Sequence, residues 1–74
     1  MLDYSPLWKT MEKKHITQYH LIQNGIDPKT IHIIKKNGNI TLLTLEKLCR
    51  IIDCMPNDII QFSEIEIKKE KIKI

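Results

Sequence analysis

Apolar residues recur along the first sixty positions with the 3.6-residue period of amphipathic helices. The clearest stripe predicts a helix over 42–53 and consists of Leu42, Leu45, Leu48, Cys49 and Ile52. A shorter stripe of Leu7, Trp8 and Met11 predicts a helix over 6–14. Each stripe would place one helix face in a core, so the pattern favours an all-α fold.

Capping signals predict where the helices start. Thr17, Asp27 and Thr41 are good N-cap residues, and each lies between an apolar residue directly before it and another four positions after it. These apolar pairs have the spacing of a hydrophobic staple and are Ile16 with Leu21, Ile26 with Ile31, and Ile40 with Leu45. Ser5 followed by Pro6 reads as an N-cap with proline at the first helical position.

Stop signals agree with these starts. Gly25 can take the left-handed conformation that closes a helix, and Asn37-Gly38-Asn39 ends the next one. A further start at Pro56 has Met55, a poor capping residue, at its cap. The sequence thus predicts an all-α, compact bundle of five short helices, at about 6–14, 17–24, 28–36, 42–53 and 56–62.

The flanks of this bundle are different in character. Residues 1–4 form an N-terminal arm before the domain at 5–62, and residues 63–74 form a charged tail rich in Ile and Lys. In the tail, Ile65 and Ile67 alternate with acids, whereas Ile72 and Ile74 have the opposite parity. The tail could be an edge strand that pairs with a partner chain, a bulged hairpin or a solvated tail.

Charge is spread unevenly along the chain. Between Lys9 and Arg50 there are eight basic and three acidic residues, a local net charge of +5 within a total of +3. A basic centre in a domain of 74 residues favours a polyanionic partner, although such charge is often only a solvated face.

Catalysis and metal binding have little support in the sequence. There is no nucleophile–base pair, no glycine-rich phosphate loop and no metal-ligand cluster, so we expect neither an enzyme nor a cofactor. Cys49 and Cys54 are interpreted as reduced, buried, small hydrophobic residues, with a redox or metal role as the alternative. No apolar run is long enough to span a bilayer and no leader pattern opens the chain, which predicts a cytoplasmic protein with no membrane partner.

The predicted second and third helices are joined by a short turn containing Gly25, which is the helix-turn-helix arrangement. If Ile31 and Ile34 face the core, the steps of about 100° per residue place Lys29 and Lys36 opposite, with His32 and Ile33 to either side. Ile33 could pack on thymine methyl groups in a major groove. Alternatively, it is a stray exposed hydrophobe or contacts a neighbouring loop.

The segment ITQYHLIQNGIDPKTIHIIKKNGNITLLTLEKLCRIIDCMPNDII resembles the Cro and CI-repressor type of helix-turn-helix domain, also called the Xre family. It is especially similar to short prophage and mobile-element regulators of Gram-positive bacteria that read PLWxTxxxKxITQYxLI at their start. The resemblance covers residues 5–62 and implies a lambda-repressor-like fold.

The resemblance also implies a DNA-binding site. Thr17 and Gln18 would open the second helix at the DNA, with Gln18 on a phosphate. Lys29 and Thr30 would meet bases and backbone, with His32, Ile33 and Lys36 deeper or flanking, and Asn37 and Asn39 would reach the next phosphate. Pro28 departs from the family, which often has a polar base-reading side chain there.

Family members commonly bind as two-fold dimers, which implies a homodimer here. The residues we expect at the dimer interface are Ile60, Phe62, Ile65 and Ile67. For Ile59 we favour a place in the monomer core.

The sequence is therefore interpreted as a sequence-specific regulator, a repressor that binds the major groove and phosphates of double-stranded DNA as a dimer on a pseudo-palindromic operator, with no small-molecule ligand. The alternative is a protein-interaction module, such as an antitoxin or antirepressor, that keeps the fold without binding an operator.

Overall fold

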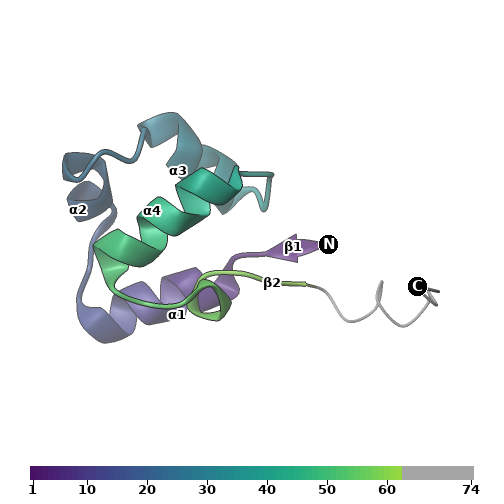
Figure 1. Cartoon of the computed structure of the whole chain (residues 1–74), viewed down its shortest axis with the longest axis horizontal. Coiled ribbons are helices and arrows are strands. Elements are labelled where there is room, and N and C mark those ends of the chain that lie inside the picture. Colours follow the sequence, from purple (N-terminus) through teal and green to yellow (C-terminus); the bar gives the residue numbers. More distant parts are fainter. Residues whose placement is uncertain (63–74) are drawn as a thin grey trace.

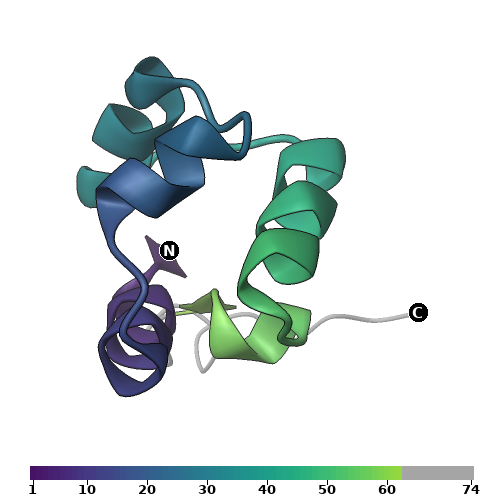
Figure 2. The ribbon, with the colours of Figure 1, turned by 90° about the vertical axis from the view of Figure 1, so that its left-hand side faces the viewer.

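The computed structural model describes residues 1–62 of the chain, which form four α-helices, one 3-10 helix and two short strands (Figure 1). In chain order these elements are β1 (Leu2–Asp3), α1 (Ser5–Lys14), α2 (Gln18–Gln23), α3 (Pro28–Lys35), α4 (Leu42–Ile52), η1 (Pro56–Asp58) and β2 (Gln61–Phe62). Helices α2 and α3 lie together at one end of the molecule, α1 lies at the other end, and α4 runs between them (Figure 2). The predicted helical bundle is confirmed.

Three predicted N-caps are present. Thr17 Oγ1 accepts a hydrogen bond of 3.1 Å from the backbone N–H of His20, and Asp27 Oδ1 accepts one of 2.8 Å from Lys29. Thr41 Oγ1 accepts one of 3.1 Å from Thr44. Each bond satisfies a backbone donor that the first helical turn leaves unpaired, so α2, α3 and α4 begin next to the residues that the sequence indicates.

The expected cap of the first helix is wrong by one residue. Ser5 is the first residue of α1, and Tyr4 occupies the N-cap position without a capping bond from its side chain. Asp3 Oδ1 accepts hydrogen bonds from the backbone N–H of Ser5 at 2.9 Å and from its hydroxyl at 2.6 Å. These bonds hold the pKa of Asp3 at about 2, the side-chain bond from Ser5 acting most strongly, followed by a bond from Gln61.

The helix predicted over 56–62 is wrong as well. Only Pro56–Asp58 is helical, as a single 3-10 turn, and the backbone then extends into β2. Strand β2 pairs antiparallel with β1, with Leu2 opposite Phe62 and Asp3 opposite Gln61. The arm at residues 1–4 thus supplies a strand, and its pairing draws residues 61–62 away from a helical path.

The core lies where the helices meet. Its buried apolar side chains are Tyr4, Leu7, Met11, Leu21, Ile26, Ile31, Ile34, Leu48, Ile52 and Ile59. Ile59 is fully buried, as favoured from the sequence, and Trp8, Leu45 and Cys49 pack against the core while half-buried. Leu42 was expected in the core but is 82% exposed, because it lies in the first turn of α4 at the rim of a surface pocket.

The expected stops between helices are formed by left-handed residues. Gly25 closes α2 with φ of +101°, as expected. After α3 the left-handed residue is Asn37, with φ of 57°, and not Gly38. Within residues 1–62, no helix combines the length and apolar character needed to cross a membrane.

Candidate nucleic-acid interface

Helices α2 and α3 form a helix-turn-helix whose turn is held from α4. Lys47 Nζ on α4 donates a hydrogen bond of 2.9 Å to the carbonyl oxygen of Gly25 in the turn. Leu21 of α2, Ile26 of the turn and Ile31 of α3 are all buried. These contacts fix α3 relative to the rest of the fold, with one face directed outward.

The outward face of α3 carries the residues expected from the helical period. Lys29, His32 and Lys36 are exposed, and Thr30 is half-buried. Ile31 and Ile34, which were assigned to the core, are buried. The structure therefore brings together on one face two ammonium groups and an imidazole, which can donate hydrogen bonds to phosphates and base edges, while the half-buried Thr30 lies closer to the core side of the helix.

Ile33 is partly exposed and also contacts the turn that follows α3. Ile33 is 40% exposed on the outward face of α3, as expected for an apolar group that can reach a major groove. It also contacts the turn after α3, since a Cβ built on Gly38 would lie only 2.7 Å from Ile33 Cγ2. The neighbouring-loop contact raised from the sequence is therefore present, and it leaves part of the side chain accessible.

The start of α2 presents Thr17 and Gln18, both exposed. The Thr17 oxygen accepts the capping bond from His20, which leaves its hydroxyl proton available for donation to an anion. Gln18 is the first residue of α2, next to the positive end of the helix dipole. Figure 1 places this end of the molecule, with α2 beside α3, away from α1.

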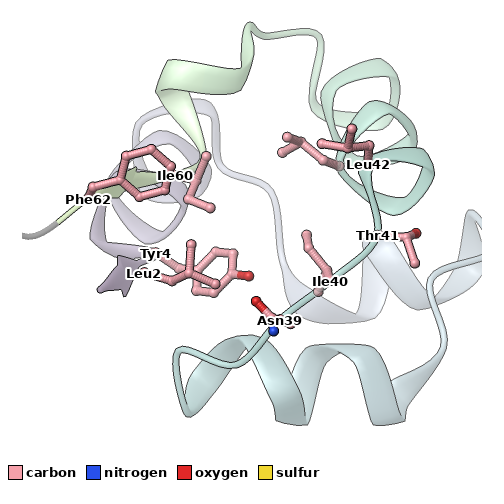
Figure 3. Close-up of a pocket in the computed structure, with 9 residues that line it drawn as sticks. Leu2, Tyr4, Asn39, Ile40, Thr41, Leu42, Ile60 and Phe62 are labelled. Atoms are coloured by element: carbon pink, nitrogen blue, oxygen red, sulfur yellow. The ribbon is translucent and has the colours of Figure 1, made fainter. Parts of the chain in front are cut away.

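The two asparagines after α3 differ. Asn37 Oδ1 accepts a hydrogen bond of 3.1 Å from the backbone N–H of Tyr4, so the carbonyl oxygen of this side-chain amide is engaged within the fold. Asn39 is exposed and lines the pocket near Tyr4 (Figure 3). Both asparagines are exposed.

Part of the basic centre has a structural role. Lys14 Nζ donates to the carbonyl oxygens of Ile52 and Asp53 at the end of α4, as Lys47 does at the end of α2. Arg50 forms an exposed ion pair of 3.5 Å with Glu46, one turn away on the same helix. The basic residues on α3 are therefore more informative about a partner than the total charge.

Sequence reasoning missed Tyr4, which joins the N-terminal arm to the end of the α3 face. Tyr4 is fully buried, and its hydroxyl donates a hydrogen bond of 2.6 Å to the carbonyl oxygen of Gly38. Burial raises the pKa of this hydroxyl, which keeps it protonated as a donor. The available signal was an aromatic residue one position before the helix start, although its partner 34 positions away could not be read locally.

An apolar pocket of about 210 Å³ lies beside this region, between the two strands and the start of α4 (Figure 3). Its lining consists of Leu2, Tyr4, Asn39, Ile40, Thr41, Leu42, Leu45, Ile60 and Phe62. Phe62 is 60% exposed and Ile60 is half-buried, so two residues expected at a dimer interface lie together here. The other two, Ile65 and Ile67, lie outside the described residues.

Other chemistry is sparse in the part of the chain that the structure describes. No group of three or more His, Cys, Asp or Glu side chains there could hold a metal ion. Cys49 and Cys54 are free thiols, both half-buried rather than fully buried. Burial raises the pKa of both thiols, that of Cys54 to about 11, which disfavours the nucleophilic thiolate.

Comparisons with known proteins agree with this geometry. The crystal structure of the transcriptional regulator VanUg has a similar fold, with a TM-score of 0.74 and 26% sequence identity over 81% of each chain. No curated protein matches the chain. The family profile described as the Cro/C1-type HTH DNA-binding domain matches residues 6–64, which span the helix-turn-helix and nearly all of the described fold. The chain therefore belongs to the Cro/C1-type helix-turn-helix family of DNA-binding domains.

Proposed function

We propose that the protein is a transcriptional regulator that binds double-stranded DNA sequence-specifically, with α3 in the major groove. The observation that carries this proposal is the outward face of α3, where Lys29, His32, Ile33 and Lys36 lie opposite the buried Ile31 and Ile34. Membership of a DNA-binding family and the likeness to a transcriptional regulator support the same function.

The remaining site residues have supporting roles in this proposal. Thr17 and Gln18 at the start of α2 bind one phosphate, and Asn39, with the free amide N–H groups of Asn37, binds another. Lys29 and Lys36 bind phosphates or guanine edges, and Thr30 and His32 lie beside them. Phosphate contacts fix the orientation of the domain, and base contacts supply the specificity.

Binding as a homodimer to a pseudo-palindromic operator is part of the proposal. The supporting observation is a pair of exposed apolar side chains that line the pocket: Leu42 and Phe62 are 82% and 60% exposed. Apolar groups gathered in this way commonly mark a protein interface. Together with Ile60 they form the proposed dimer surface. A dimer that covers an operator excludes RNA polymerase, so the regulator acts as a repressor in the cytoplasm.

The DNA-binding proposal is tested by fluorescence anisotropy with a random-sequence duplex at several salt concentrations. We expect log affinity to fall linearly with log salt, and Lys29→Ala/Lys36→Ala to flatten the slope by about one to two units. Lys9→Ala/Lys13→Ala, on α1, removes the same charge from a helix at the opposite end and is the matched control. If the two double variants have equal slopes, the α3 face does not engage DNA.

The dimer surface is tested by sedimentation equilibrium. Phe62→Ser is expected to shift the protein toward monomer, whereas Met55→Ser, at an exposed apolar residue that does not line the pocket, is expected to leave the equilibrium unchanged. A wild-type protein that stays monomeric both alone and on DNA would argue against this surface.

A second candidate function is a protein-interaction module. The same exposed apolar surface favours it, because a partner protein could cover Leu42 and Phe62 in place of a second copy. The salt titration separates the two functions. An interaction module that does not use DNA shows no binding to the duplex at low salt.

A further inference from the structure

Gly38 is a glycine that the backbone conformation does not require. The left-handed residue of the turn after α3 is Asn37, and the only glycine with positive φ in residues 1–62 is Gly25. An alanine at position 38 would therefore meet no conformational penalty of the kind that reserves a position for glycine. The reason for a glycine at this position must therefore be steric.

Ile33 occupies the space that a Cβ at position 38 would need. A Cβ on Gly38 would lie 2.7 Å from Ile33 Cγ2 and 3.3 Å from the Ile33 carbonyl oxygen. The first distance is far inside van der Waals contact, so either the turn or the side chain would have to move. Absence of a Cβ at position 38 is what allows the turn to pass against Ile33.

The turn cannot easily move, because Gly38 is held on both sides. Its backbone N–H donates a hydrogen bond of 2.9 Å to the carbonyl oxygen of Ile33, and its own carbonyl accepts the 2.6 Å bond from Tyr4. The preceding residue is held too, since Asn37 Oδ1 accepts from the backbone N–H of Tyr4 at 3.1 Å. Tyr4 is in turn fully buried in the core.

The side chain of Ile33 is the part that would yield, and its freedom is limited. A β-branched residue in a helix has one strongly preferred χ1 rotamer. With Cγ2 packed on Gly38, the rest of the side chain is available to supply the exposed surface on the α3 face. The contact with Gly38 in the turn thus determines the orientation of the isoleucine side chain that faces the DNA.

We propose that Gly38 is a positioning residue for sequence readout. It lets the turn after α3 hold Ile33 in one orientation, and so determines which base step the isoleucine recognises by apolar contact with a thymine methyl group. Gly38 needs no contact with DNA for this. The inference rests on the proposed function, because it assigns a determinant of specificity within the same surface.

The experiment is selection of binding sites from a randomised duplex library, carried out with wild type, Gly38→Ala, Ile33→Ala and the double variant. We expect wild type to enrich a motif with a thymine preference, and Gly38→Ala to weaken that preference by about fivefold or more at one base pair per half-site. In the Ile33→Ala background, Gly38→Ala should not alter the base preference further, because alanine at position 33 has no Cγ2 to displace and the 3.3 Å contact with the carbonyl oxygen is the same in both backgrounds.

Affinity for non-specific DNA and its salt dependence provide a readout that separates positioning from a general structural role. Phosphate contacts dominate non-specific binding, so we expect Gly38→Ala to leave both unchanged. If Gly38→Ala instead lowers affinity for all sequences equally, in both backgrounds, its role is structural and the proposal is wrong. Unaltered base preferences in Gly38→Ala would also overturn it.

Tyr4→Phe keeps the test decisive if Gly38→Ala does not fold. This variant releases the carbonyl of Gly38 without adding an atom, and we expect it to broaden the preference at the same base pair. An unchanged preference there would contradict the proposal. If wild type enriches no motif at all, the proposed function fails together with the inference, whereas a wild-type motif that the variants retain refutes the inference alone.

Discussion

The hydroxyl of Tyr4 donates a hydrogen bond to the carbonyl oxygen of Gly38, joining the residue before α1 to the turn after α3. The bond links the first residues of the chain to the end of the candidate DNA-binding face. Local sequence patterns give no sign of this contact, because its two partners are 34 positions apart.

Tyr4→Phe is expected to lower the free energy of unfolding by about 1 kcal/mol, because it removes one buried donor and leaves a carbonyl unpaired. Urea denaturation followed by circular dichroism measures the change. Tyr19→Phe is the matched control, since Tyr19 is largely exposed on α2 and should cost little. Equal losses in the two variants would contradict a specific role for the Tyr4 hydroxyl.

Gly25→Ala is expected to destabilise the fold by about 1–2 kcal/mol, because an L side chain is strained in the left-handed region. Gly25 has φ of +101°, and an added Cβ would also lie 2.8 Å from Lys47 Nζ. The same substitution in a Lys47→Ala background, again measured by urea denaturation, separates the two causes. We expect most of the loss to persist there, since the lysine terminus can move. A loss that disappears would identify the overlap with Lys47 as the main cause.

The pKa of Asp3, held at about 2, predicts a pH dependence of stability. Since the folded-state pKa is lower than the ordinary value of 3.8, ionised Asp3 stabilises the fold above that value, and the contribution is lost as pH falls toward about 2. Thermal melts of wild type and Asp3→Asn should therefore differ at neutral pH and converge in acid. Carboxyl NMR titration checks the pKa directly.

Gln61→Ala provides the second arm of this test. It removes the donor of the 2.7 Å hydrogen bond from Gln61 Nε2 to Asp3 Oδ2. The pKa of Asp3 should then rise toward its ordinary value while remaining lowered by the bonds from Ser5. A wild-type midpoint near 3.8 would contradict the role of Asp3 as the acceptor of the hydrogen bonds from Ser5 and Gln61.

The raised pKa values of the two thiols predict slow alkylation. Burial is the main cause, and the nearby carboxylate of Asp58 adds to it at both cysteines. Iodoacetamide labelling followed by mass spectrometry should be slow at neutral pH and should accelerate as the pH approaches about 11, the pKa of Cys54. The urea-unfolded chain is the control and should react faster at neutral pH. Equal rates in the folded and unfolded states would show that burial does not protect the thiols.

The features predicted correctly from the sequence are those set by local interactions. Thr17, Asp27 and Thr41 each bond to a backbone N–H two or three residues ahead, so the sequence alone locates these helix starts. The α3 face follows in the same way, because burial of Ile31 and Ile34 fixes by the helical period which side chains point outward.

The features predicted incorrectly depend on pairing across the chain. Residues 61–62 join a strand, and not a helix, because β1 is available to them from the other end of the sequence. Leu42 continues an apolar stripe at helical spacing, yet it lies past the end of the core, where only the tertiary arrangement decides burial. The approach of Gly38 to Ile33 could not be predicted either, since it depends on the path of a turn.

Pairing of Leu2 with Phe62 also constrains the order of folding. Closing a loop of this length has a large entropic cost, so the two strands are expected to join after the local helices have formed. On the ribosome, Leu2 and Tyr4 are made first but must wait for Phe62 to emerge before β1 gains its partner. We therefore expect the turn behind Ile33 to reach its final shape only after β2 has been synthesised, and a nascent chain stopped before β2 to carry an α3 whose support from Tyr4 is incomplete.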